Sequence, residues 1–128
     1  MSELIAESLE YLADTDLDVY QRVFDAFYRE SPAAENLMLH MDELTKGRML
    51  EEVTRLLMSV DVELEAAYLD FELRNHEQAY GVERQMYRQL FNAFAAVVRD
   101  LAGDRWTPEY EQVWHSRIDE LSSAMEAA

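Results

Sequence analysis

One histidine closes the apolar helical pattern Tyr68-Leu69-Asp70-Phe71-Glu72-Leu73-Arg74-Asn75-His76, and Tyr80-Gly81-Val82 follows it. Apolar residues at helical spacing predict a helix that carries His76. Gly81 ends this helix well, because glycine adopts the left-handed backbone conformation without a steric cost. The stretch therefore predicts a helix and then a corner, with an imidazole shortly before the corner.

Two more helices are expected after this corner. Tyr87 opens a long apolar pattern at helical spacing, and Gly103 ends it. The chain restarts at Trp106-Thr107-Pro108-Glu109, where a proline and an acidic residue suit the first turn of a helix. The residues expected to face inward from this last helix are Trp114, Ile118, Leu121 and Met125.

The chain before residue 68 also has helical periodicity. Ser2 can cap a first helix, and Asp14-Thr15-Asp16 breaks it. Ser31-Pro32 and Asp42 are expected to begin a short and a longer helix. The stripe expected on the second helix is Leu17, Tyr20, Phe24, Phe27 and Tyr28, and the face expected on the helix from Asp42 is Lys46, Leu50, Val53, Leu57 and Val60. The pattern predicts one all-α domain over residues 1–128, with about six to eight helices.

The composition agrees with a helical domain. The 128 residues are 49% hydrophobic, which is too apolar for a disordered chain, and they include only 3 glycines and 2 prolines. No apolar run approaches the roughly 20 residues of a membrane span. The N-terminal residues are acidic, unlike those of a signal peptide, and cysteine is absent. We therefore expect a cytoplasmic protein without disulfides or thiolate chemistry.

The net charge is −16, from 27 acidic and 11 basic residues. Such a surface repels phosphate backbones and anionic lipids, so we expect neither nucleic acid nor a membrane as a partner. The charge can serve solubility in a salt-rich cytoplasm, or it can dock the protein to a basic partner.

The order of His76, Gly81-Val82 and Trp106-Thr107-Pro108-Glu109 resembles the C-terminal half of bacterial single-domain, haemoglobin-like globins. The resemblance implies a globin-like fold and haem b, an iron protoporphyrin, as the cofactor. It implies that oxygen or another diatomic gas binds at the iron, for oxygen storage, sensing or scavenging of nitric oxide. It also allows a homodimer through the last two helices. Any reductase would be a separate protein, because no flavin or nicotinamide domain is fused here.

The resemblance also assigns residues to the two faces of the haem. His76 becomes the metal ligand on the proximal side, where Leu73 and Val82 would wall the disc. On the distal side, the stacking phenylalanine of the family is replaced by Met38, and the usual distal histidine or glutamine is replaced by Lys46. The remaining residues that it implies for cofactor binding are Phe24, Leu50, Arg84 and Tyr87. His40 and His115 are expected to be solvated.

Lys46 has two interpretations on the distal side. Its ammonium group can neutralise a haem propionate or extend to water. Alternatively, desolvation beside an apolar disc favours the neutral amine, which can bind iron.

A second class of function is a haem-free globin-like domain that acts in regulation or protein interaction. We find no Gly-rich phosphate loop, cysteine nucleophile or Ser–His–Asp set, so the sequence does not predict an enzyme.

Overall fold

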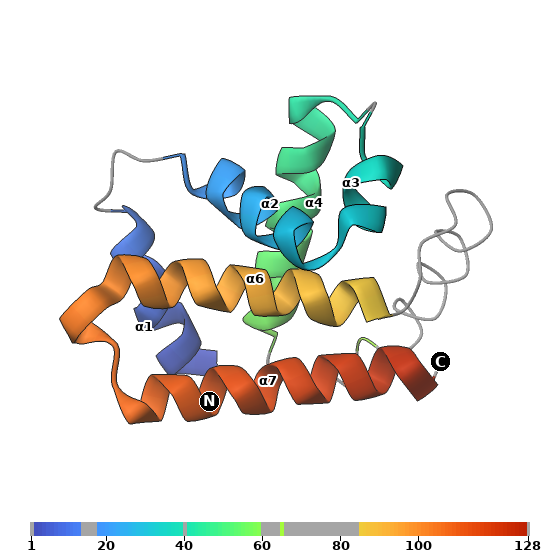
Figure 1. The fold of residues 1–128 in the computed structure, drawn as a ribbon. Coiled ribbons are helices and arrows are strands. Elements are labelled where there is room, and N and C mark those ends of the chain that lie inside the picture. Colours follow the sequence, from blue (N-terminus) through green and yellow to red (C-terminus); the bar gives the residue numbers. More distant parts are fainter. Residues whose placement is uncertain (1, 14–17, 40, 60–64, 66–84, 128) are drawn as a thin grey trace.

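The computed structural model describes residues 2–13, 18–39, 41–59, 65 and 85–127 (Figure 1). Its helices are α1 (Ser2–Ala13), α2 (Val19–Glu30), α3 (Pro32–Leu37), α4 (Glu43–Leu57), α6 (Gln85–Ala102) and α7 (Pro108–Ala127). A 3₁₀ turn, η2 (Gly103–Arg105), joins the last two. No strand occurs in these ranges, so the all-α class predicted from the sequence is confirmed.

Helix α6 lies at the centre of the arrangement. It runs antiparallel to α7 and makes its most extensive contacts with α2, while α1 packs against both α6 and α7 (Figure 1). Helix α4 begins on the same side of α6 as α2, passes behind α6 in the view of Figure 1 and contacts α7. The largest fully buried side chains of the core include Phe91 and Phe94 of α6 and Trp114 of α7.

Side-chain caps explain where the middle helices begin. The Ser31 hydroxyl accepts from the Ala34 amide at 3.2 Å, and Pro32 takes the first turn of α3. The Asp42 carboxylate accepts from the Thr45 amide at 2.7 Å. Each cap satisfies one amide that the first turn of a helix leaves without a backbone partner. Both caps confirm the helix starts predicted from the sequence.

The beginning of α2 differs in detail from the prediction. Its cap is Asp18, whose carboxylate accepts from the Gln21 amide at 3.0 Å. Tyr20 was expected on the buried stripe, and that prediction is wrong, because its exposed fraction is 39%. Tyr20 lies in the first turn of α2, before the residues that enter the core. The expected break at residues 14–16, Leu17 and Val60 lie outside the described residues.

Gly103 and the buried face of α7 follow the prediction. Helix α6 ends at Ala102, and Gly103 has a φ of 57°, which is the left-handed conformation that favours glycine. The four residues expected to face inward from α7 are all buried: Trp114, Ile118, Leu121 and Met125.

Two buried polar contacts tie α7 to distant parts of the chain. The Trp114 indole donates to the Ser8 hydroxyl at 2.8 Å, and that hydroxyl donates to the Ile5 carbonyl at 2.7 Å. Arg117 is only 3% exposed, and its Nη1 donates to the carbonyl of Ser59 and, at 3.1 Å, to the hydroxyl of Ser59. Its Nε is buried without a hydrogen-bond partner.

Replacing Ser8 by alanine tests the link between α1 and α7. Ser8→Ala leaves the buried Trp114 indole without an acceptor, so we expect the free energy of unfolding to fall by about 1–3 kcal/mol. Denaturant unfolding followed by circular dichroism measures this change. Ser123→Ala, at an exposed position of α7, is the control and should have almost no effect. Equal losses for the two variants would contradict the assignment.

Candidate functional site

Apolar side chains from three consecutive helices are buried in the region assigned to the distal side. Phe24 lies on α2, Met38 caps the C-terminal end of α3, and Leu50 lies on α4. Their exposed fractions are 2%, 7% and 0%, and all three belong to one core cluster. We call these three residues the apolar wall.

Lys46 brings one positive charge to this wall. It lies one turn before Leu50, so both side chains leave α4 on the same face. Its Nζ is 5.6 Å from the centroid of the Phe24 ring and 5.9 Å from that of Tyr28. An ammonium within about 6 Å of an aromatic face is attracted to the ring's negative quadrupole. The structure thus brings together Lys46 and Phe24, two residues that the sequence had assigned to one site.

Lys46 also has an acidic neighbour and is partly exposed to solvent. Its side chain is 18% exposed, and Nζ lies 3.8 Å from a carboxylate oxygen of Glu43, whose side chain is 84% exposed. The aromatic contacts lie on one side and the exposed carboxylate on the other. Lys46 therefore lies where the apolar wall meets solvent, and it can present its ammonium to an anionic group there.

Tyr28 shares this environment. Its ring lies 5.9 Å from Phe24 and 6.0 Å from Phe27, centroid to centroid. Burial raises the pKa of the Tyr28 hydroxyl above its ordinary value, while the charge of Lys46 and a hydrogen bond to it act in the opposite direction. Glu35 and Glu43 add to the rise. The neutral phenol is therefore the form that the fold stabilises.

Tyr28 and Glu43 were missing from the predicted site. Tyr28 lies one turn after Phe24 on the same stripe of α2, and Glu43 lies one turn before Lys46 on α4. Helical spacing was the signal that could have found both, because residues three or four apart are neighbours on a helix.

The other predicted site residues divide into two groups. Tyr87 is half-buried on α6 and packs against the core. His76, Leu73, Val82 and Arg84 lie outside the described residues, and so does His40. His115 is described: its side chain is 77% exposed, and Nε2 lies 3.3 Å from Asp119. This agrees with the expectation that His115 is solvated.

Across the described ranges, no group of three or more His, Asp or Glu side chains is arranged to hold a metal ion. No helix in the same ranges has both the length and the apolar character needed to cross a bilayer. No protein-family model and no curated protein matches the chain. Any assignment of function therefore depends on the residues themselves and on their arrangement.

The contact between Lys46 and Tyr28 predicts a change in the titration of the phenol. Lys46→Met removes the positive charge that opposes the rise in the pKa of Tyr28, so this pKa should rise further. Ultraviolet titration of the phenolates measures it, and Tyr28→Phe identifies the signal. Because the folded-state pKa is raised, the neutral phenol contributes stability below the unfolded value of about 10, and this contribution is lost as pH rises through the folded value. An unchanged or lowered pKa in Lys46→Met would contradict the contact.

Proposed function

We propose that this chain is a globin-like haem protein that binds oxygen or another diatomic gas at an iron ligated by His76. The observation that supports the proposal best is the meeting of Lys46 with Phe24 at the apolar wall. The resemblance assigns Phe24 of α2, Met38 at the end of α3 and Leu50 of α4 to one face of a haem. All three are buried, and Lys46 lies against the Phe24 ring. The absence of cysteine is compatible with a reducing cytoplasm, where we place the protein.

The residues present fit the chemistry of haem. Haem is a flat, mostly apolar disc with two anionic propionates at one edge. Phe24, Met38 and Leu50 are the aromatic, thioether and aliphatic kinds of side chain that suit such a disc, and they would contact it if the neighbours that now bury them moved apart. Lys46 offers a partly exposed cation that suits a propionate. On the proximal side, His76 would hold the iron, Leu73 and Val82 would contact the disc, and Arg84 would offer a second cation. When bound, the iron would supply the site at which a gas is held.

The chain's own residues would then control the pocket. The imidazole of His76 needs a fixed orientation, and the carbonyl one turn earlier in its predicted helix is a suitable acceptor for its second N–H. With haem bound, the apolar side chains of Phe24, Met38 and Leu50 would exclude water from the face that the resemblance assigns to them. Lys46 replaces the usual distal histidine or glutamine, and it already has aromatic rings and the exposed Glu43 carboxylate as partners where the core meets solvent. We therefore propose that Lys46 pairs with a propionate and does not bind the iron.

A haem-free regulatory domain is the second candidate. The observation that favours it is the burial of the apolar wall, because Phe24 and Leu50 are already 2% and 0% exposed within the chain itself. A net charge of −16 would suit a basic protein partner. Reconstitution of the purified protein with hemin distinguishes the two candidates: a stoichiometric Soret band supports the haem protein, and its absence supports the haem-free domain.

Replacing the proposed ligand tests the haem assignment. His76→Ala should abolish the Soret band on reconstitution, because no other imidazole is expected near the iron, while the far-ultraviolet circular dichroism stays near that of the parent. His115→Ala is the matched control, since its imidazole is exposed and adjacent to Asp119. A Soret band that survives in His76→Ala, or that is lost in His115→Ala, would mean that the ligand is wrong.

Variants of Lys46 separate its two interpretations. If it pairs with a propionate, Lys46→Met should release haem faster to an excess of apomyoglobin, and Lys46→Arg should retain it, because the arginine keeps the charge. The ferric spectrum of the parent should then show no change of spin state that depends on Lys46 between neutral and alkaline pH. A low-spin alkaline form that disappears in Lys46→Met would instead identify the amine as an iron ligand.

A further inference from the structure

Four oxidisable aromatic side chains form a continuous chain where α1, η2 and α7 meet. The distance between ring centroids is 6.4 Å from Trp114 to Trp106, 5.7 Å from Trp106 to Tyr110 and 6.2 Å from Tyr110 to Tyr11. Such spacings are those of rings in contact. We call these four residues the aromatic chain. One end of the aromatic chain is Trp114, which is buried in the core with an exposed fraction of 1%. None of the four residues is among those assigned to the proposed haem site.

Two members of the aromatic chain have carboxylate partners that can accept a proton. The Tyr110 hydroxyl donates a hydrogen bond to the Glu7 carboxylate. The Trp106 indole donates to the Glu111 carboxylate at 2.7 Å. Oxidation by one electron makes the proton of a phenol or an indole far more acidic, so a base already at hydrogen-bond distance makes that oxidation easier.

Local charges make Tyr110 easier to oxidise than Tyr11. The Arg105 guanidinium lies 4.2 Å from the centroid of the Tyr11 ring, and a cation in this position opposes the loss of an electron. Tyr110 instead faces a carboxylate. The hydrogen bond to Glu7, together with one to Tyr11 and burial, raises the pKa of Tyr110, so the phenol keeps its proton until it is oxidised.

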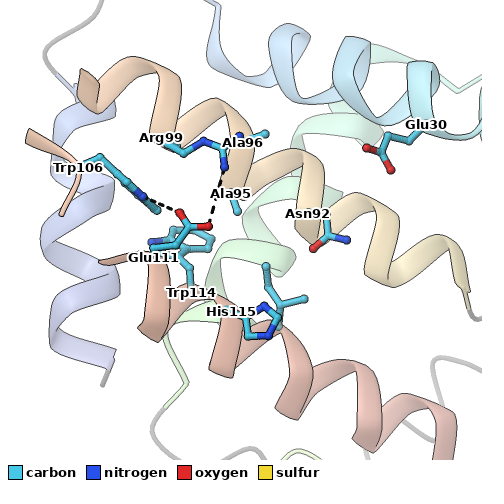
Figure 2. Close-up of a pocket in the computed structure, with 10 residues that line it drawn as sticks. Glu30, Asn92, Ala95, Ala96, Arg99, Trp106, Glu111, Trp114 and His115 are labelled. Atoms are coloured by element: carbon cyan, nitrogen blue, oxygen red, sulfur yellow. Dashed lines mark hydrogen bonds and ion pairs between the residues drawn. The ribbon is translucent and has the colours of Figure 1, made fainter. Parts of the chain in front are cut away.

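A groove gives small molecules access to Trp106. It has a volume of about 330 Å³ and is lined mainly by α6 and α7, with Trp106, Trp114 and Glu111 among its lining residues (Figure 2). Figure 2 shows Glu111 between Trp106 and Arg99, and one of its oxygens lies 3.9 Å from Nη1 of Arg99. Trp106 is half-buried and is therefore the member that a small oxidant meets from this groove.

We propose that the aromatic chain is a one-electron relay, which accepts an oxidising equivalent at Trp106 from a small radical oxidant and transfers it to Tyr110. In the first step, Trp106 gives one electron to the oxidant and its indole proton to Glu111. In the second step, Tyr110 gives one electron to Trp106 and its hydroxyl proton to Glu7, while Trp106 recovers its proton from Glu111. The net result is a reduced oxidant, a neutral tyrosyl radical at Tyr110 and a protonated Glu7.

Pulse radiolysis of the full-length protein tests this relay. The azidyl radical oxidises tryptophan preferentially, so the absorption of the tryptophanyl radical should appear first. It should then decay as the tyrosyl absorption grows, at a rate independent of protein concentration. Tyr110→Phe removes one hydroxyl and should slow this conversion by about tenfold or more, which corresponds to a barrier higher by roughly 1.4 kcal/mol. Tyr20→Phe, at the exposed tyrosine of α2, is the matched control and should leave the rate unchanged.

Glu7→Gln tests the proton transfer separately from packing. The glutamine keeps an oxygen that can accept the hydrogen bond of Tyr110, but it is a far weaker base, so the conversion should slow by a similar factor with the circular dichroism preserved. The relay is overturned if Tyr110→Phe converts as fast as the parent, if Tyr20→Phe is slowed as much, or if the rate scales with protein concentration. An unchanged rate in Glu7→Gln would overturn the role of Glu7 as the proton acceptor.

Discussion

The position of α6 between α2 and the pair α1 and α7 is the constraint on which the rest of the structure depends. Helix α6 can fill this position because its buried side chains, from Ala93 through Leu90 and Phe94 to Phe91, cover a wide arc of its circumference. Because α2 packs on one side of α6, the apolar wall and Lys46 lie on that side. Because α1 and α7 pack on the other, the aromatic chain lies there. The two features therefore occupy separate regions of one core.

Much of this arrangement could be predicted from the sequence, because helical periodicity and capping are local properties. Ser31-Pro32, Asp42 and Gly103 each determine a helix boundary through their own backbone or side-chain chemistry. Tyr20 shows the limit of this reasoning. Periodicity places a residue on a face of a helix, but it cannot tell where along the helix the neighbouring elements stop covering that face.

The candidate site could be predicted less completely, for the same reason. The resemblance assigns Lys46 and Phe24 to the same side of a haem, and the structure shows that they meet. The proximity of Tyr28 to Lys46 depends on how α2 and α4 approach each other, which spacing along one helix does not reveal. The pairing of Tyr110 with Glu7 is a stronger example, because it joins residues near opposite ends of the chain. No local sequence pattern around Glu7 or around Tyr110 predicts that these two side chains pair.

The contacts of α7 with Ser59 and Arg88 hold two other helices at neighbouring points of α7. Ser59, two residues after the end of α4, is bound by the buried Arg117. Arg88, in the first turn of α6, donates to Asp119 at 2.8 Å. The end of α4 and the start of α6 are therefore both joined to α7 through residues only two positions apart. Helix α7 thus acts as a common support that fixes where α4 ends relative to where α6 begins.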